Sequence, residues 1–344
     1  MILNFNNKKI FSVIIPVYNG ENTIERALAS LISNKKYIKE VIIINDCCTD
    51  STQNIVNKFI KNNYFNIRCF KNEKRLGVGY SRKLGIKKSN GKWITFLDAD
   101  DCITANSLRY VYNQIYNNDD LDIIHTQTIY YESGTFEKNN IGYSNYSCGG
   151  NFYKRKFLID NNLFPHDTLE MAEDQYFNEI IMLFIDYVDL NNVKERIGYY
   201  DYPVYEVHHD IYDYSSFALE NWDEYCCKYH LLYKQFVINY CIENNIDLDI
   251  VCDDYVNNFI FCYYLANALV DDVDFDLSIE DFNEYFHNAL IFFEEKFNIN
   301  RSYILKYYEN NNEEITRIIL NEAETSVGYT INLKINFDEF INSL

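Results

Sequence analysis

KWITFLDADD, from Lys92 to Asp101, is the stretch from which the fold of this 344-residue chain is predicted. The apolar run from Trp93 to Leu97 is short and continuous, with aromatic and β-branched residues. Such a run is typical of a central strand in a sheet that is covered on both faces. The run leads into three carboxylates. Asp98 and Asp100 are two positions apart, so in extended backbone their side chains point the same way.

Two interpretations fit this acidic strand end. Neighbouring carboxylates stay ionised together only when a cation or a hydrogen-bond donor lies between them. A divalent cation with oxygen ligands, such as Mg²⁺ or Mn²⁺, meets that need. Alternatively, the acidic turn only ends the strand and caps a helix that begins near Thr104. This stretch alone leaves both interpretations open.

The composition argues against several classes of protein. The net charge of −20 disfavours nucleic acid or an anionic membrane as the main partner. The 10 cysteines form no CxxC pair, which disfavours a zinc ribbon or a disulfide framework and indicates a reducing compartment. Residues 1–10 lack a secretory signal, and the longest apolar run, Phe259 to Val270, is too short to span a bilayer. We therefore expect a cytoplasmic protein without a transmembrane segment.

Apolar runs alternate with helical periodicity along the first 130 residues. Strands are predicted at Phe11 to Val17, Glu40 to Ile44, Asn66 to Phe70, Trp93 to Leu97 and Asp122 to Ile129, with helical patterns between them. Asn22 is expected to cap the first helix, with Glu25 in the capping-box position. Strands and helices that alternate through short turns predict a mostly parallel sheet with helices on both faces.

Ligands of such sheets bind beyond the carboxyl ends of the strands. Asn19, Asp46, Asn72 and Asp98 each fall just after a predicted strand, so we expect them at one rim of the sheet. Dinucleotide binding is disfavoured because no glycine-rich turn follows the first strand. The segment that begins Gly77-Val78-Gly79 has Arg82 where a G-x-G-x-x-G motif has its last glycine. A P-loop lysine motif is also missing.

Five segments, in order along the chain, resemble family 2 glycosyltransferases, which are inverting enzymes of the GT-A fold. The segments are VIIPVYNGENTIERALASL (Val13 to Leu31), VIIINDCCTDST (Val41 to Thr52), NEKRLGVGYSRKLGI (Asn72 to Ile86), FLDADD (Phe96 to Asp101) and AED (Ala172 to Asp174). The resemblance implies a Rossmann-like GT-A catalytic domain over residues 1–215. Residues 216–344 show aromatic and aliphatic residues at helical spacing, which predicts an all-α C-terminal region.

The resemblance also implies roles for individual residues. It places Pro16, Val17, Tyr18, Glu21, Asp46, Arg82, Asp98 and Ala99 around a nucleotide-sugar donor, and it gives Asp98, Asp100 and His208 as ligands of Mn²⁺ or Mg²⁺. Asp46 would accept a hydrogen bond from a uracil ring, and Asp174 would be the catalytic base. The implied reaction moves a hexosyl or N-acetylhexosaminyl group from a UDP-sugar to a hydroxyl of a glycan or glycoconjugate. Judged without the resemblance, Asp174 would only complement a helix dipole, and His208 would be a surface-loop histidine.

Three departures from the family pattern leave other functions open. Asn45 replaces the first Asp of the second motif, Cys47-Cys48 replaces Gly-Ser, and Glu206 replaces the frequent Arg before His208. These changes would suit a catalytically inactive nucleotide-sugar-binding or scaffold protein derived from the same family. A nucleotidyltransferase would normally carry a glycine-rich loop with Arg and Lys after the first strand, where this chain has PVYNGE. The Q-x-x-R-W signature of processive synthases is absent, which predicts transfer of single sugars.

Overall fold

The computed structural model describes residues 9–131, 138–143, 147–169, 173–189, 196–208, 236–237, 239–241 and 243–246. The chain divides into two compact units, Met1–Leu219 and Glu220–Leu344. In the second unit, the described residues between 236 and 243 are helical, and the rest of the predicted all-α region lies outside the described residues. The domain boundary after residue 215 stays a prediction. None of the described helices combines the length and the apolar character needed to cross a membrane.

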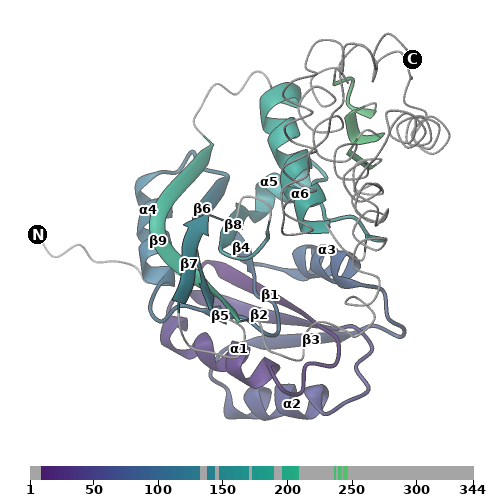
Figure 1. Cartoon of the computed structure of the whole chain (residues 1–344), viewed down its shortest axis with the longest axis vertical. Coiled ribbons are helices and arrows are strands. Elements are labelled where there is room, and N and C mark those ends of the chain that lie inside the picture. Colours follow the sequence, from purple (N-terminus) through teal and green to yellow (C-terminus); the bar gives the residue numbers. More distant parts are fainter. Residues whose placement is uncertain are drawn as a thin grey trace, which may run out of the picture. The chain divides into compact units, whose positions relative to one another are not determined.

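The first half of the first unit is an alternating series of strands and helices (Figure 1). Its strands are β1 (Phe11–Val17), β2 (Ile38–Asn45), β3 (Ile67–Lys71) and β4 (Trp93–Phe96), and its helices are α1 (Ile24–Ser30), the 3₁₀ turn η1 (Ile32–Asn34), α2 (Thr52–Asn62) and α3 (Val78–Lys88). The strands lie in the order β3-β2-β1-β4, and each adjacent pair is parallel. The predicted parallel sheet is confirmed here.

The second half extends the same sheet with mixed strand directions. It contains β5 (Cys102–Ile103), α4 (Leu108–Asn117), β6 (Ile123–Tyr131), β7 (Lys138–Tyr143), β8 (Asn151–Lys154), α5 (Arg155–Asp160), α6 (Glu173–Leu183), the π-helical η2 (Phe184–Val188) and β9 (Ile197–His208). β8 is antiparallel to both β4 and β6, whereas β9 runs parallel to β6. β5 ends the sheet in an antiparallel pair with β9, and β7 pairs antiparallel with β6, outside the main strand order.

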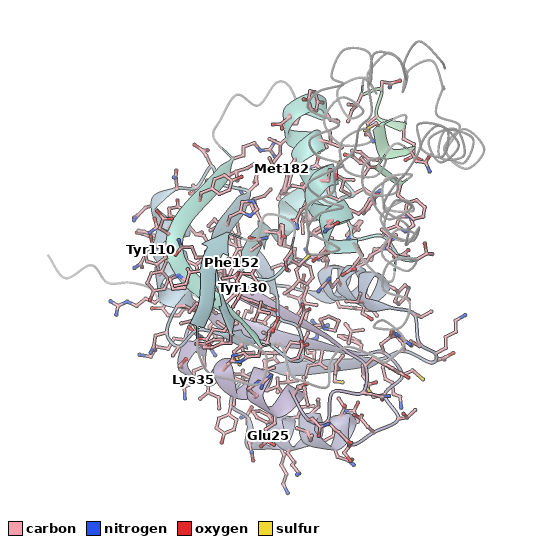
Figure 2. All side chains as sticks on the ribbon, in the orientation of Figure 1. Glu25, Lys35, Tyr110, Tyr130, Phe152 and Met182 are labelled. Atoms are coloured by element: carbon pink, nitrogen blue, oxygen red, sulfur yellow. The ribbon has the colours of Figure 1, made fainter. Side chains whose placement is uncertain are left out.

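Helices cover both faces of the parallel part, as the sequence predicts. α1 and α2 lie on one face and α3 on the other (Figure 1). The alternate residues Phe11, Val13, Ile15 and Val17 of β1 join the core cluster with α1 and α2. Ile14 faces α3, where Gly85 permits close approach because a Cβ there would lie 2.3 Å from an Ile14 methyl carbon. Each such buried side chain contributes about 1.5–3 kcal/mol through the hydrophobic effect. In the second half, Phe152 of β8 is fully buried (Figure 2).

The predicted capping box at the start of the first helix is wrong. α1 begins at Ile24 with Thr23 as the N-cap residue, and no side chain caps it. The amides of Thr23 and Ile24 both donate to the carbonyl of Gly20 at 3.1 and 3.0 Å. Backbone hydrogen bonds in the turn after β1 therefore satisfy amide groups at the start of the helix, a role that was expected of the Asn22 side chain.

The turn after β2 contains a strained residue. Cys47 has a φ of 65°, in the left-handed region where a residue with a Cβ costs about 1–2 kcal/mol relative to glycine. Replacing Cys47 with glycine is therefore expected to raise the free energy of unfolding by about 0.5–1 kcal/mol, since glycine's greater unfolded-state entropy offsets part of the gain. Urea denaturation measures this change. Cys69→Gly, inside β3, is the matched control and should lower stability; a loss at Cys47 as well would contradict the strain.

Candidate functional site

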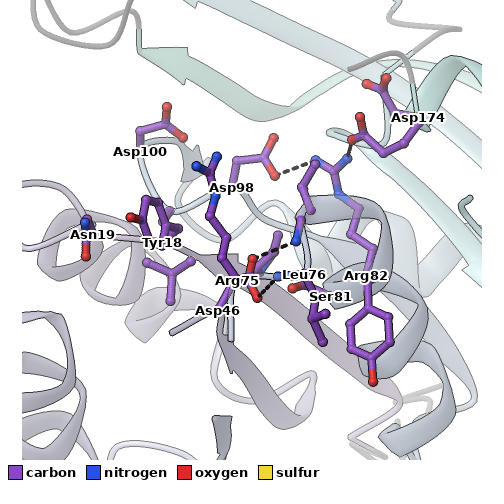
Figure 3. A pocket seen from close by; sticks show the side chains of 18 of the residues that line it. Tyr18, Asn19, Asp46, Arg75, Leu76, Ser81, Arg82, Asp98, Asp100 and Asp174 are labelled. Atoms are coloured by element: carbon purple, nitrogen blue, oxygen red, sulfur yellow. Dashed lines mark hydrogen bonds and ion pairs between the residues drawn. The ribbon is translucent and has the colours of Figure 1, made fainter. Parts of the chain in front are cut away.

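One pocket of about 1540 Å³ opens beyond the carboxyl ends of β1, β2 and β4 (Figure 3). Its lining includes the predicted site residues Pro16, Val17, Tyr18, Asp46, Arg82, Asp98, Ala99, Asp100 and Asp174. Asn19, Asp46 and Asp98 share this rim as expected, and Asn72 lies behind Asp46, to which it donates a hydrogen bond. Turns that are far apart in the sequence are therefore brought to one cavity by the parallel order of the strands.

Two of the predicted site residues lie outside this pocket's lining. The Oε2 atom of Glu21 accepts a hydrogen bond from the Ser51 amide at 2.9 Å, so Glu21 joins the turn after β1 to the start of α2. His208 lines a second cavity of about 290 Å³, which shares Asp98 and Asp100 with the main pocket. Its ring stacks on Tyr131 with centroids 4.6 Å apart, and its Nε2 lies 3.5 Å from a carboxylate oxygen of Glu206.

Asp46 holds the loop between β3 and α3 in place through hydrogen bonds. Its Oδ1 accepts hydrogen bonds from Asn72 Nδ2 at 2.7 Å and from the Leu76 amide at 2.9 Å, and its Oδ2 accepts one from the Gly77 amide at 2.8 Å. The side chain is buried, with 3% of its surface exposed. A carboxylate has about four acceptor positions, so these three bonds leave one position of Oδ2 for a ligand.

The same loop places a cation against an aromatic ring at the pocket entrance. The guanidinium carbon of Arg75 lies 4.5 Å from the centroid of the Tyr18 ring, and both residues line the pocket (Figure 3). Tyr18 is 45% exposed. An exposed aromatic ring and a positive charge therefore lie together at this end of the pocket, a combination that suits a flat polar ligand.

Arg82 is the buried centre of the other end of the pocket. Its Nη2 donates to Asp98 Oδ1 at 2.7 Å, and its Nη1 forms an ion pair with Glu173 (Figure 3). Gly79, one turn earlier in α3, allows this pairing because a Cβ there would lie 2.1 Å from the carbonyl oxygen of His166. The close approach brings α3 against the start of α6, where Glu173 and Asp174 lie.

Burial and mutual charge shift the acids around Arg82. Burial raises the pKa of Glu173 to about 8, although the Arg82 guanidinium acts in the opposite direction. Burial also raises the pKa of Asp174, with Asp98 adding to the shift and Arg82 opposing it. Burial opposes the charge of Arg82, but the carboxylates of Asp98 and Glu173 hold its pKa well above the ordinary value. A carboxyl with a raised pKa is suited to exchange a proton with a substrate hydroxyl.

The acids after β4 have the chemistry of a divalent-cation site. Burial and the charges of Asp100 and Asp98 raise the pKa of Asp101 well above the ordinary value, which indicates excess negative charge at this turn. Among the described residues, no three His, Cys, Asp or Glu side chains are arranged as a complete metal site. Mg²⁺ is usually held by one or two carboxylates together with substrate phosphates. Asp98 and Asp100 could supply the carboxylates of such a site.

The buried Glu173 predicts how stability depends on pH. Its folded pKa of about 8 lies above the ordinary 4.5, so between these values the folded chain binds more protons than the unfolded chain. The free energy of unfolding is therefore expected to fall as pH rises from about 5 to 8, by up to about 1.4 kcal/mol per pH unit. Chemical denaturation at several pH values measures the slope, which Glu173→Gln should flatten. An equal slope in parent and variant would contradict the assignment.

Three residues that contribute to the site were not predicted from the sequence. Glu173 belongs to the AED segment of the resemblance, but its pairing with Arg82, 91 positions earlier, was not predicted. Arg75 lies on the ring of Tyr18, and the only signal for it was a basic loop. Arg26 of α1 donates to the backbone oxygen of Asp100 and so fixes the acidic turn. Each depends on a long-range contact, which residue order alone does not encode.

The comparisons with known proteins agree with this geometry. Residues 12–180 match the family described as "Glycosyl transferase family 2". The chain is 31% identical over 197 residues to the minor teichoic acid biosynthesis protein GgaA of Bacillus subtilis, covering 50% of this chain and 43% of GgaA. It is 30% identical over 183 residues to the poly(ribitol-phosphate) β-N-acetylglucosaminyltransferase TarS of Staphylococcus aureus, covering 48% of this chain and 31% of TarS. The chain thus matches less than half the length of either relative.

Solved structures show the same fold. The structure of S. aureus TarS 1–349 in complex with UDP-GlcNAc aligns with a TM-score of 0.60 at 20% identity, covering 95% of this chain and 94% of that chain. The mannosyltransferase PcManGT from Pyrobaculum calidifontis, in complex with GDP-Man and Mn²⁺, aligns with a TM-score of 0.50 at 12% identity, covering 92% and 86% of the two chains. At these identities the likeness establishes the GT-A fold.

Proposed function

Because residues 12–180 of this chain belong to glycosyl transferase family 2, we propose that it transfers an N-acetylhexosamine or hexose from a UDP-sugar, with inversion, to a hydroxyl of a polyol-phosphate or other glycoconjugate acceptor. The observation that carries the proposal is the meeting of Asp46, Arg82, Asp98, Asp100 and Asp174 in one pocket. UDP-GlcNAc in the TarS complex supports the donor, and the names of TarS and GgaA support the acceptor class. A cytoplasmic location stays a prediction.

The donor would lie along the pocket with its base at Tyr18 and its sugar toward Asp174. The remaining acceptor position of Asp46 would take an N–H of the uracil ring, and Arg75 would lie close to the base and ribose. Asp98 and Asp100 would hold Mn²⁺ or Mg²⁺, and PcManGT is a relative in fold that was solved with Mn²⁺. When bound, the cation supplies electrostatic stabilisation for the departing diphosphate. His208 would reach it only from the second cavity.

Asp174 would act as the base for the attacking hydroxyl. The hydroxyl oxygen forms the new bond to the anomeric carbon as the bond from that carbon to the diphosphate oxygen breaks. The hydroxyl proton passes to Asp174, and the bonding electrons leave with the diphosphate. Arg82 neutralises part of the negative charge of Asp98 and Glu173. These ion pairs hold the side chains at the bottom of the pocket in fixed positions in a low-dielectric environment.

The altered turn at Asn45 does not weaken this proposal. Asn45 is fully buried: its Oδ1 accepts the Cys48 amide at 2.8 Å, and its Nδ2 donates to Gln53 at 2.8 Å. It therefore shapes the turn that presents Asp46 and does not line the pocket. Of the three departures that suggested an inactive protein, the one at Asn45 therefore has a structural explanation.

A panel of UDP-, GDP-, dTDP- and CMP-sugars tests the proposal. We expect a UDP-sugar to raise the Tm in the presence of Mn²⁺, since a ligand of the native state adds to its stability, and to be hydrolysed slowly with release of UDP. EDTA and Asp100→Asn should each abolish the hydrolysis. A full-length protein that neither binds nor turns over any sugar nucleotide in the panel would overturn the proposal.

A further inference from the structure

We propose that the second cavity, between the acidic turn after β4 and the strands β6 and β9, binds the acceptor as an uncharged polyol or saccharide unit. This inference rests on the proposed function and specifies its second substrate. The cavity has a volume of about 290 Å³ and shares only Asp98 and Asp100 with the main pocket. The main pocket already extends from Tyr18 to Asp174, so the whole donor has room without it. The second cavity is therefore available to the acceptor.

A buried hydroxyl without a partner belongs to a residue in the wall of this cavity. Thr128 of β6 lines the cavity and is 1% exposed, and its Oγ1 finds no hydrogen-bond partner in the part of the chain that the structure describes. A buried unpaired hydroxyl costs roughly 1–3 kcal/mol. Rotation of the Thr128 side chain toward the cavity would bring Oγ1 within reach of a ligand hydroxyl, and the new hydrogen bond would remove that cost.

The rest of the lining suits a compound with both C–H and O–H faces. Tyr130 of β6 (Figure 2) and Val207 of β9 provide apolar surface, and Ser147 provides a second hydroxyl. The Ser147 oxygen accepts the Gly149 amide at 3.1 Å, so its own proton is available to a ligand. Mixed apolar and hydroxyl walls are typical of sites for small polar molecules.

Charge decides against a phosphorylated ligand. Asp98, Asp100 and Asp101 all line the cavity, and among its described lining residues there is neither Lys nor Arg. Asp98 and Asp100 would be neutralised by the divalent cation, but no described lining residue is a Lys or Arg that could pair with a phosphate. The unit that enters is therefore neutral, and any phosphodiester of a longer acceptor stays outside.

Asn178 links the backbone of the cavity wall to the backbone at Asp174. Asn178 of α6 donates from Nδ2 to the carbonyl oxygen of Ser147 at 3.3 Å and to that of Asp174 at 3.0 Å. Cys148, the next residue after Ser147, is fully buried close to Asp174. Asp174 itself lines the main pocket, so an acceptor unit in the second cavity would present its attacking hydroxyl past Asp98 and Asp100 toward that carboxyl.

The test measures how donor turnover divides between transfer and hydrolysis. With the UDP-sugar identified by the panel, ribitol and N-acetylglucosamine serve as separate acceptor probes, and mass spectrometry quantifies glycosylated probe against free sugar. We expect saturable transfer to at least one probe, and weaker transfer to ribitol 5-phosphate. Thr128→Leu, which fills the cavity, should lower the ratio of transfer to hydrolysis at least about tenfold, and Thr128→Val should raise the KM for the probe about 2- to 10-fold.

Tyr116→Phe, on the exposed side of α4, is the matched control and should keep the parent ratio. Circular dichroism and Tm show whether each variant folds. An unchanged ratio in both Thr128 variants, or a parent that hydrolyses the donor but transfers to neither probe, would overturn the inference while leaving the donor reaction standing. A parent without any donor turnover would instead contradict the proposed function.

Discussion

Replacing Asp174 with asparagine is expected to lower kcat for sugar transfer by about 10²- to 10⁴-fold, because general-base catalysis by one side chain contributes that much. Asparagine keeps the size of the side chain and its position at the start of α6, where the aspartate carboxylate caps the amide of Gln175 at 2.9 Å. The KM for the donor should change little, since the role assigned to Asp174 is toward the acceptor hydroxyl. Steady-state assays of UDP release and product formation measure both constants.

The pH profile separates a catalytic role from a structural one. A base must be deprotonated to act, so kcat should rise with pH through the pKa of Asp174, which burial raises above 3.8. The acid limb should therefore lie at a higher pH than for an ordinary aspartate and vanish in Asp174→Asn. Asp160→Asn, on the partly exposed α5, is the control and should keep the parent profile. A variant at Asp174 with the parent kcat and acid limb would refute the assignment.

Replacing Arg82 with methionine is expected to lower the free energy of unfolding by about 3–5 kcal/mol near pH 8.5. The change removes a buried cation from between Asp98 and Glu173, and the Glu173 carboxylate is then buried without its partner. The loss should be smaller at pH 6, because Glu173, whose pKa is already about 8, then holds a proton at little cost. Urea denaturation at the two pH values measures the difference.

A double variant tests the cause of that loss. Arg82→Met combined with Glu173→Gln should recover part of the stability at pH 8.5, since the buried charge left behind is then removed. Arg109→Met, on the exposed part of α4, is the control and should cost less than about 0.5 kcal/mol. A loss below 1 kcal/mol in the single variant at Arg82, or the same loss at both pH values, would contradict a central role for this ion pair.

The parallel part of the fold was predictable because its strands carry their own signal. β1, β2 and β4 are mostly apolar and, apart from Lys39 of β2, buried on both faces, and the turns that follow them contain the polar site residues. β5, β7 and β8 were not predicted. β5 and β8 are only two and four residues long, and such short strands are defined by pairing with distant partners such as β4 and β9.

The site could be predicted as far as its residues belong to the turns after parallel strands. Asp46, Asp98 and Asp100 fall into that class, because topology alone brings those turns together. Glu21 bonds instead to the backbone at Ser51, and His208 lies in the second cavity. The position of either side chain depends on how a neighbouring turn packs, which a single sequence does not specify. The resemblance to the family implied a role for each of these two residues but did not predict their contacts.

The three hydrogen bonds that Asp46 accepts have a consequence for how this chain can diverge. The Asp46 carboxylate, which is proposed to bind the base, also accepts the hydrogen bonds that hold Leu76, Gly77 and Asn72 in place. A substitution that altered the preferred base would at the same time release the segment that carries Arg75. Descendants of this protein can therefore exchange the sugar or the acceptor one residue at a time, whereas a new nucleotide requires several coordinated substitutions.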